Sequence, residues 1–180
     1  MDPYTIALDP ETGKYCTLYL FADVENIEDV RKKLIAGKLL CCVVKASLIV
    51  HPFQVVVAAN KAALTEKYGQ LTTKSVYTEI LFCLSTSKNI SRSLMEFGIN
   101  DKDRNIIVAV IHEPKNLPTI SDLIHNEVKG KSVSILRLLQ FTNFDLVKKT
   151  YDIGEEELAV SSYIDSIVSR ISSKDFSVLK

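Results

Sequence analysis

The chain has 180 residues, 47% of them apolar, with equal numbers of basic and acidic side chains. This composition excludes a disordered chain, and a chain of this length buries roughly 70% of its unfolded surface without crosslinks. The longest apolar runs, such as LLCCVV, are far below the roughly 20 residues that a membrane-spanning helix needs. The acidic start lacks the basic segment of a signal peptide, so we expect a soluble intracellular protein.

Charge is distributed unevenly along the chain. Residues 1–30 carry a net charge of −6 and residues 151–180 one of −3, whereas residues 31–150 carry +9. A basic segment between acidic ends can bind a polyanion. The alternative is a surface on which opposite charges mix in space, and composition alone favours that alternative.

In chain order, the first predicted element is a strand at residues 15–21, where Cys16, Leu18 and Leu20 alternate with the other side chains. A helix follows at 26–36, with Asn26 as candidate N-cap. Residues 42–50 are predicted as a strand or as a loop with a helical turn. A proline in the first turn then opens a helix over 52–68.

The next three elements differ in how sharply their pattern defines them. Residues 75–85 favour a helix, although the apolar run also fits a buried strand. Residues 90–97 predict a short helix that Asn89 caps. Residues 104–113 form a β-branched run that is typical of a buried strand.

Two helices are predicted toward the end of the chain. One covers 120–129, with Thr119 or Ser121 as its cap. The other covers 154–173 and begins with three glutamates, where the helix dipole favours negative charge. Its apolar residues form one wide stripe that docks either on the protein's own core or on a partner. The stripe consists of Val160, Tyr163, Ile164, Ile167, Val168 and Ile171.

Four glycines follow segments with helical periodicity, at positions where a left-handed C-cap is wanted. They are Gly37, Gly69, Gly98 and Gly130. Together these elements predict one α/β domain over residues 1–180, with a small mixed sheet packed by several helices. Residues 1–14 and 174–180 are expected to be less ordered.

Known catalytic and metal signatures are missing from the sequence. The glycines lie too far apart for a phosphate loop, the three histidines have no metal-ligand spacing, and no nucleophile elbow occurs. The four cysteines form no C-x-x-C pair, so we interpret them as reduced, buried thiols. A site that assembles only in space remains the alternative, a small α/β enzyme using Glu79, His112 or Cys83.

Several basic residues in the middle of the chain are candidates for contacts with the phosphates of a nucleic acid. Few aromatic residues lie among them, which limits base stacking. No signature of a common RNA-binding domain is present. The basic candidates are Lys61, Lys67, Lys74, Lys88 and Arg92, with Asn60 and Asn89 as polar contacts.

Two quoted stretches carry a family resemblance. VHPFQVVVAANKA (50–62) and TTKSVYTEILFCLSTSKNISRSLMEFGI (72–99) resemble the PRPK-binding protein (TPRKB) family, a small subunit of the KEOPS (EKC) complex. LVKKTYDI and IVSRISSKD are similar as well, so the resemblance covers nearly the whole chain. The chain differs from the family where it has His51 in place of a frequent aspartate and Lys74 in place of a frequent arginine.

The resemblance implies a non-catalytic binding subunit without cofactor, metal or small-molecule substrate, located in cytoplasm and nucleus. Such a subunit binds and stimulates a kinase-like ATPase and helps to recruit tRNA through its 3′ CCA end for threonylcarbamoyladenosine (t6A) modification. It also implies a compact α/β fold. We therefore expect the C-terminal stripe to contact the kinase-like subunit through Tyr163, Ile164, Ile167, Val168 and Ile171. The basic candidates and both asparagines would then contact tRNA.

Overall fold

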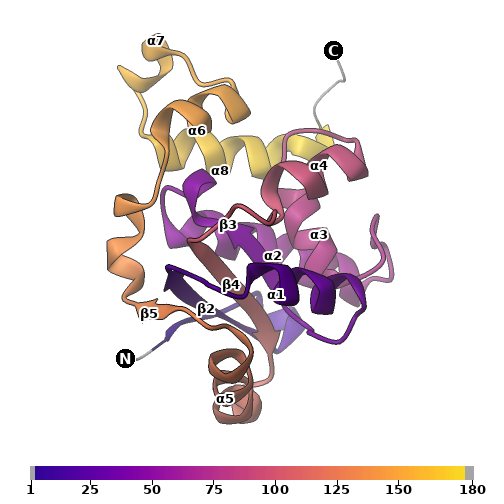
Figure 1. Ribbon diagram of the computed structural model, residues 1–180. Helices are drawn as coiled ribbons and strands as arrows, with labels where there is room; N and C mark the ends of the chain where they lie inside the picture. Colours follow the sequence, from indigo (N-terminus) through magenta and orange to yellow (C-terminus); the bar gives the residue numbers. More distant parts are fainter. Residues whose placement is uncertain (1–2, 177–180) are drawn as a thin grey trace.

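The computed structural model of the protein describes residues 3–176. Its centre is one sheet in the order β1-β2-β4-β3, with β5 beside β2 (Figure 1). The strands are β1 (Tyr4–Ala7), β2 (Tyr15–Ala22), β3 (Cys42–Lys45), β4 (Ile106–His112) and β5 (Lys131–Val133).

Every pairing in this sheet is antiparallel, whereas a mixed sheet was expected. Strands β2 and β3 do run in the same direction, and the helix α1 (Ile27–Ile35) lies between them in sequence. Strand β4, from much later in the chain, inserts between them and pairs with both. Because the insertion depends on a distant segment, the local pattern does not reveal it.

Both faces of the sheet are buried. On one face, Leu18 and Leu20 of β2 belong to a core cluster that includes residues of five helices. These helices are α2 (Pro52–Lys67), α3 (Val76–Leu84), α4 (Ile90–Phe97), α6 (Phe144–Tyr151) and α8 (Tyr163–Ser173). On the other face, Tyr19 and Phe21 pack against α1 and α5 (Leu117–Glu127). This second helical layer buries the face of β2 that an alternating apolar pattern would leave exposed to solvent.

The three helices predicted within residues 52–97 are confirmed at nearly the expected bounds. His51 is the N-cap of α2, because its Nδ1 accepts a hydrogen bond of 3.1 Å from the amide of Phe53. Ser75 starts α3 with a reciprocal capping box to Thr78, and this helix excludes the alternative strand. The segment 42–50 contains both predicted forms, a strand followed by the helical turn Ala46–Leu48.

Two predicted caps are wrong. The side chain of Asn26 does not cap α1; it donates to the carbonyl of Glu127 and accepts from the amide of Lys129, joining α1 to the end of α5. Helix α5 starts at Leu117, earlier than Thr119 or Ser121, because a proline in its first turn needs no amide partner. The side chain of Asn26 therefore makes tertiary hydrogen bonds and is not available as a helix cap.

The four glycines serve two different purposes. Gly37 and Gly69 have φ values of 67° and 66°, which confirms the predicted left-handed C-caps. Gly98 and Gly130 do not adopt that conformation. A Cβ on Gly130 would lie 2.9 Å from Cγ2 of Val24, so this glycine permits close packing instead.

The single C-terminal helix expected over 154–173 is wrong. The chain forms α7 (Glu155–Leu158), breaks, and restarts as α8, whose N-cap Ser162 accepts a hydrogen bond from the amide of Asp165. Val160 lies in the break with 88% of its surface exposed, so it is not part of the apolar stripe. Figure 1 shows α6, α7 and α8 together at the top of the molecule.

The chain ends are built into the fold further than expected. Strand β1 extends the sheet at residues 4–7, and Lys174 in the turn after α8 is 97% buried. The remaining expectation for the termini falls on residues 1–2 and 177–180, which lie outside the described residues.

Candidate functional site

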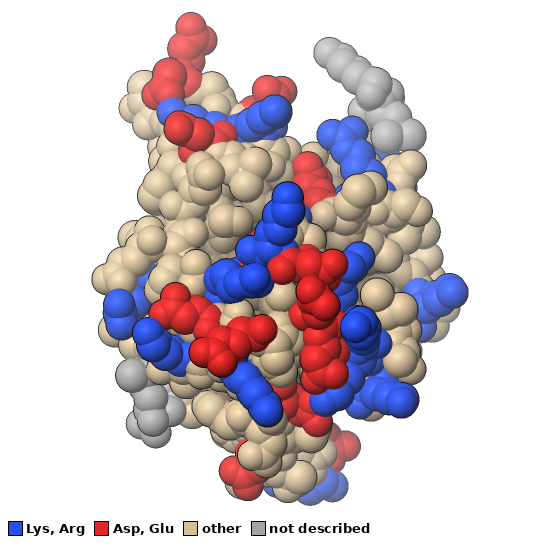
Figure 2. All heavy atoms as spheres, in the orientation of Figure 1, with Lys and Arg blue, Asp and Glu red and all other residues tan. Residues whose placement is uncertain are grey.

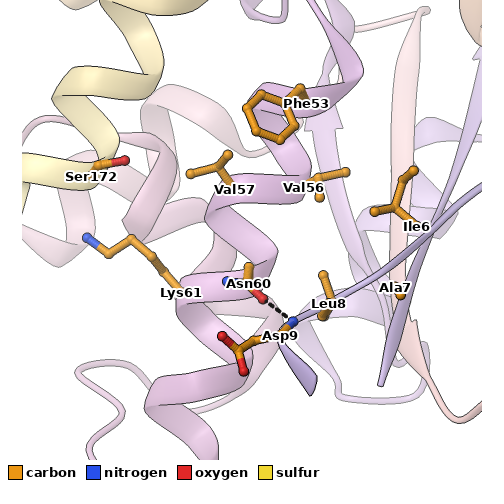
Figure 3. A pocket seen from close by; sticks show the side chains of 10 residues that line it. All are labelled: Ile6, Ala7, Leu8, Asp9, Phe53, Val56, Val57, Asn60, Lys61 and Ser172. Carbon is orange, nitrogen blue, oxygen red and sulfur yellow. Dashed lines mark hydrogen bonds between the residues drawn. The ribbon is translucent and has the colours of Figure 1, made fainter. Parts of the chain in front are cut away.

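A pocket of about 550 Å³ lies between β1, α2 and α8, three elements far apart in sequence. Figure 3 shows Ile6, Phe53 and Val57 at its apolar end and Asn60 and Lys61 at its polar end. Phe53 is 47% exposed although it is a large apolar side chain on the first turn of α2. We call this hollow the α8 pocket.

Two of the predicted tRNA contacts line this pocket and are engaged inside the protein. Oδ1 of Asn60 accepts a hydrogen bond of 2.7 Å from the amide of Asp9 (Figure 3). Nζ of Lys61 lies 2.9 Å from the carbonyl oxygen of Ile171 and 2.9 Å from a carboxylate oxygen of Asp175. Both side chains therefore tie a chain end to α2.

Other predicted basic contacts lie along the α2–α3 hairpin. Lys67, at the end of α2, donates to the carbonyl of Glu11 and lies 3.8 Å from its carboxylate. Lys74 is exposed in the loop before α3, and Lys88 is exposed in the loop after it. Since α3 has nine residues, its axis separates these two loops by about 13 Å. The predicted basic contacts Lys74 and Lys88 therefore lie at opposite ends of α3.

The start of α4 matches its predicted local structure. Oδ1 of Asn89 accepts a hydrogen bond of 2.9 Å from the amide of Arg92, as an N-cap does. Both residues are exposed. This cap uses the Asn89 side chain oxygen and leaves the guanidinium of Arg92 at the surface.

The acidic chain ends fold back onto the basic middle segment. Lys131 pairs with Asp23 at 2.8 Å, Lys61 pairs with Asp175, and Lys148 pairs with Glu155. In Figure 2, acidic and basic side chains interleave across the face that contains α1. The opposite charges of the linear sequence therefore mix in space, as the alternative interpretation of the charge pattern states.

Helix α8 divides the predicted kinase contacts into two sets. Ile167 and Ile171 are 0% and 1% exposed and belong to the core, which corrects their assignment to an interface. Their four-residue spacing places both on one side of α8, in the core cluster that they share with α2. Tyr163, Ile164 and Val168 remain partly exposed.

Two of the partly exposed residues, Ile164 and Val168, form a row that continues into the α8 pocket. Ile164, Val168 and Ser172 are each four residues apart, so they share one side of α8. Ser172 lines the pocket opposite Val57 of α2 (Figure 3). The row and the pocket therefore make one partly apolar surface on α8 and α2.

A clamp that sequence reasoning missed holds α7 on α8. The guanidinium of Arg170 binds both carboxylate oxygens of Glu157, at 2.6 and 2.7 Å, and also the carbonyl of Asp152. This bidentate pair lowers the pKa of Glu157 to about 2. The two residues are thirteen positions apart across the helix break, so no periodic signal could reveal them.

The residues of the alternative enzyme site are not brought together in a hollow. Glu79 accepts hydrogen bonds from the amide and hydroxyl of Thr73, at 2.8 and 2.7 Å, and so closes the loop before α3. His112 bonds the hydroxyl of Thr17 and the carbonyl of Glu113. Burial raises the pKa of the Cys83 thiol to about 12. None of the three lines the α8 pocket.

Residues 3–176 contain neither a helix that could cross a membrane nor a metal-binding group. The helices there are all too short or too polar to cross a membrane. The same residues contain no group of three or more histidine, cysteine or acidic side chains placed to hold a metal ion.

Comparison with known proteins identifies relatives over nearly the whole chain. The family model described as kinase binding protein CGI-121 matches residues 21–175. The EKC/KEOPS complex subunit TPRKB of Danio rerio is 33% identical over 159 residues, which are 88% of this chain and 90% of that protein. The EKC/KEOPS complex subunit CGI121 of Yarrowia lipolytica is 30% identical, over 80% of this chain and 83% of that protein.

A more distant relative extends the match to the ends. The EKC/KEOPS complex subunit cgi121 of Schizosaccharomyces pombe is 24% identical over 176 residues, which are 96% of this chain and 99% of that protein. The chain therefore belongs to the CGI-121 family of kinase-binding proteins.

Proposed function

We propose that this protein is a non-catalytic subunit of the KEOPS (EKC) complex in cytoplasm and nucleus. It binds and stimulates the kinase-like ATPase subunit of the PRPK family and helps to recruit tRNA through the 3′ CCA end for t6A modification. The names of the curated relatives, all KEOPS subunits, support membership of the complex. The family description supports binding of a kinase.

The observation that carries the kinase contact is the row of Ile164 and Val168 beside the α8 pocket. An apolar row at four-residue spacing is a common way for a helix to dock in a partner's groove. Phe53, 47% exposed at the apolar end of the pocket, extends the same surface onto α2. Large aromatic side chains are frequent binding hot spots at protein interfaces.

Co-purification with the kinase-like subunit tests this assignment. We expect Val168→Glu to abolish it, because the substitution places a charge in an apolar interface. The matched control is Val160→Glu, at a position that is 88% exposed in the break between α7 and α8, and it should leave co-purification intact. Thermal melting of both variants checks that they fold. Retention of the kinase by folded Val168→Glu would place the interface on another surface.

The proposed tRNA contacts are the exposed basic residues that flank α3, namely Lys74, Lys88 and Arg92. Binding to phosphates should weaken steeply with salt, because each contact releases counterions. A gel shift with the assembled complex should weaken further when the CCA end is removed. We expect Lys74→Met with Arg92→Met to reduce the salt slope by about one per lost phosphate contact. An affinity for tRNA that changes neither with salt nor with removal of the CCA end would contradict this part of the proposal.

A further inference from the structure

A second hollow, of about 490 Å³, lies away from the α8 pocket, between the segment after α1, strand β3 and helices α3 and α4. We call it the α1–α4 groove. Three aliphatic side chains at its margin are strongly exposed: Ile35 at 77%, Leu40 at 67% and Met95 at 75%. Exposed apolar side chains gathered at one hollow are unusual on a monomer and mark interaction sites.

Three hydroxyls in the groove already form hydrogen bonds within the protein. The hydroxyls of Ser75 and Thr78 bond each other and the first turn of α3 in the capping box. The hydroxyl of Tyr77 donates to the carbonyl of Ile111 at 3.4 Å. The groove therefore recognises a ligand mainly by apolar contact and shape, with little capacity for specific hydrogen bonds.

The backbone of β3 offers no long free edge for strand addition at this groove. Gly98 forms a bridge with Val44 on the outer side of β3. A Cβ at position 98 would lie 2.4 Å from the carbonyl oxygen of Leu94, so glycine is what allows the end of α4 to pack here. An occupant must consequently bind through its side chains, as a helix does in a groove.

Basic side chains outnumber acidic ones at the rim of the groove, where Glu96, next to the lining residue Met95, and Asp101 are acidic. Arg31 is the one charged residue among those that line it, and its partner Asp101 is 3.1 Å away at the rim. Lys38 and Lys74 are exposed and directly precede the lining residues Leu39 and Ser75. Nζ of Lys45 bonds the carbonyl of Met95. In Figure 2, the basic side chains on the right-hand side, toward α3, lie next to a column of acidic ones.

We propose that the α1–α4 groove binds an amphipathic helix of a second protein, with aliphatic side chains in the groove and acidic side chains facing the basic rim. Charge complementarity selects an acidic partner. Nucleic acid would also suit the rim, but unpaired bases bind by stacking on aromatic rings. Among the described residues that line the groove, Tyr77 is the only aromatic one, which favours the helix.

A synthetic labelled helix with leucine at i, i+3, i+4 and i+7 and glutamate elsewhere is the probe for this site. We expect it to bind the full-length protein, as measured by fluorescence anisotropy, and to weaken with added salt. Leu40→Glu should weaken binding at least about tenfold by placing a charge in the groove. Leu136→Glu is the matched control, since Leu136 is 90% exposed and does not line the groove, and it should bind normally.

Three results would overturn the proposal. One is that the glutamate helix fails to bind, or binds Leu40→Glu as well as it binds the unaltered protein. Another is equal binding of a helix in which lysine replaces glutamate. The third is that a single-stranded oligonucleotide ending in CCA displaces the probe and loses affinity in Leu40→Glu, which would assign the groove to nucleic acid. Because Val168 and the α8 pocket are elsewhere, failure here leaves the kinase assignment unaffected.

Discussion

The α8 pocket and the α1–α4 groove have similar volumes, but the polar residues that line them make different kinds of contact. Polar contacts across the pocket join distant residues: Asn60 to Asp9, and Lys61 to Ile171 and Asp175. The polar groups of the groove bond mostly to near neighbours, as in the capping box of Ser75. The pocket therefore depends on docking of both chain ends, whereas the groove margin contributes little to holding the fold together.

The largest difference should appear between a buried side chain behind the α8 pocket and an exposed one at the margin of the groove. Ile171→Ala removes a side chain that is 1% exposed behind the α8 pocket and should lower the free energy of unfolding by about 3 kcal/mol. Met95→Ala at the groove margin, 75% exposed, should change it by less than about 0.5 kcal/mol. Urea denaturation measures both. Similar losses for the two variants would contradict the comparison.

A smaller, pH-dependent effect is expected at Lys174, which follows α8. Its ammonium donates to the carbonyl of Phe82 and lies 3.4 Å from the centroid of that ring. Burial lowers its pKa from 10.5 to about 8. The charge of Lys61 acts in the same direction, whereas the charges of Cys83, Asp175 and Glu79 oppose it. The unfolded chain therefore binds more protons between pH 8 and 10.5, so this residue makes stability rise with pH in that window.

Lys174→Met should remove this contribution. Since raised thiol pKa values also affect stability at alkaline pH, the useful quantity is the difference in unfolding free energy between the two proteins. The thiols titrate in both and cancel. We expect the free energy of unfolding of the unaltered protein to rise relative to that of the variant as pH rises from 7 to about 9.5. A difference that stays constant over this range would show that the amine is not desolvated in solution.

The smallest effect separates two lysines that sequence alone treats alike. Lys61→Met should cost about 1 kcal/mol, because it breaks a hydrogen bond and a partly buried ion pair at the pocket. Lys74→Met should leave stability unchanged, because Lys74 is exposed and has no ion-pair partner within residues 3–176. Thermal melts of both variants measure this. Equal melting temperatures would mean that Lys61 does not tie the chain end to α2.

Local patterns predicted most elements because their causes are local. Ser75 before α3 and Asn89 before α4 each accept a hydrogen bond from an amide three residues on, and Pro52 at the start of α2 has no amide to satisfy. The same reasoning failed for Asn26, whose amide group bonds Glu127 and Lys129 instead. It also missed the break after α7, which Arg170 bridges by binding Glu157 from the far side.

By itself, the sequence determined an α/β domain, the bounds of α2, α3 and α4, and the family to which the chain belongs, because these depend on periodicity, capping and motif identity. Only the tertiary structure decided which side chains are available to a partner. It buried Ile167 and Ile171 while leaving Val168 partly exposed, and it engaged Lys61 while leaving Lys74 exposed. Burial and ion pairing are set by segments more than a hundred residues apart, and no local pattern contains that information.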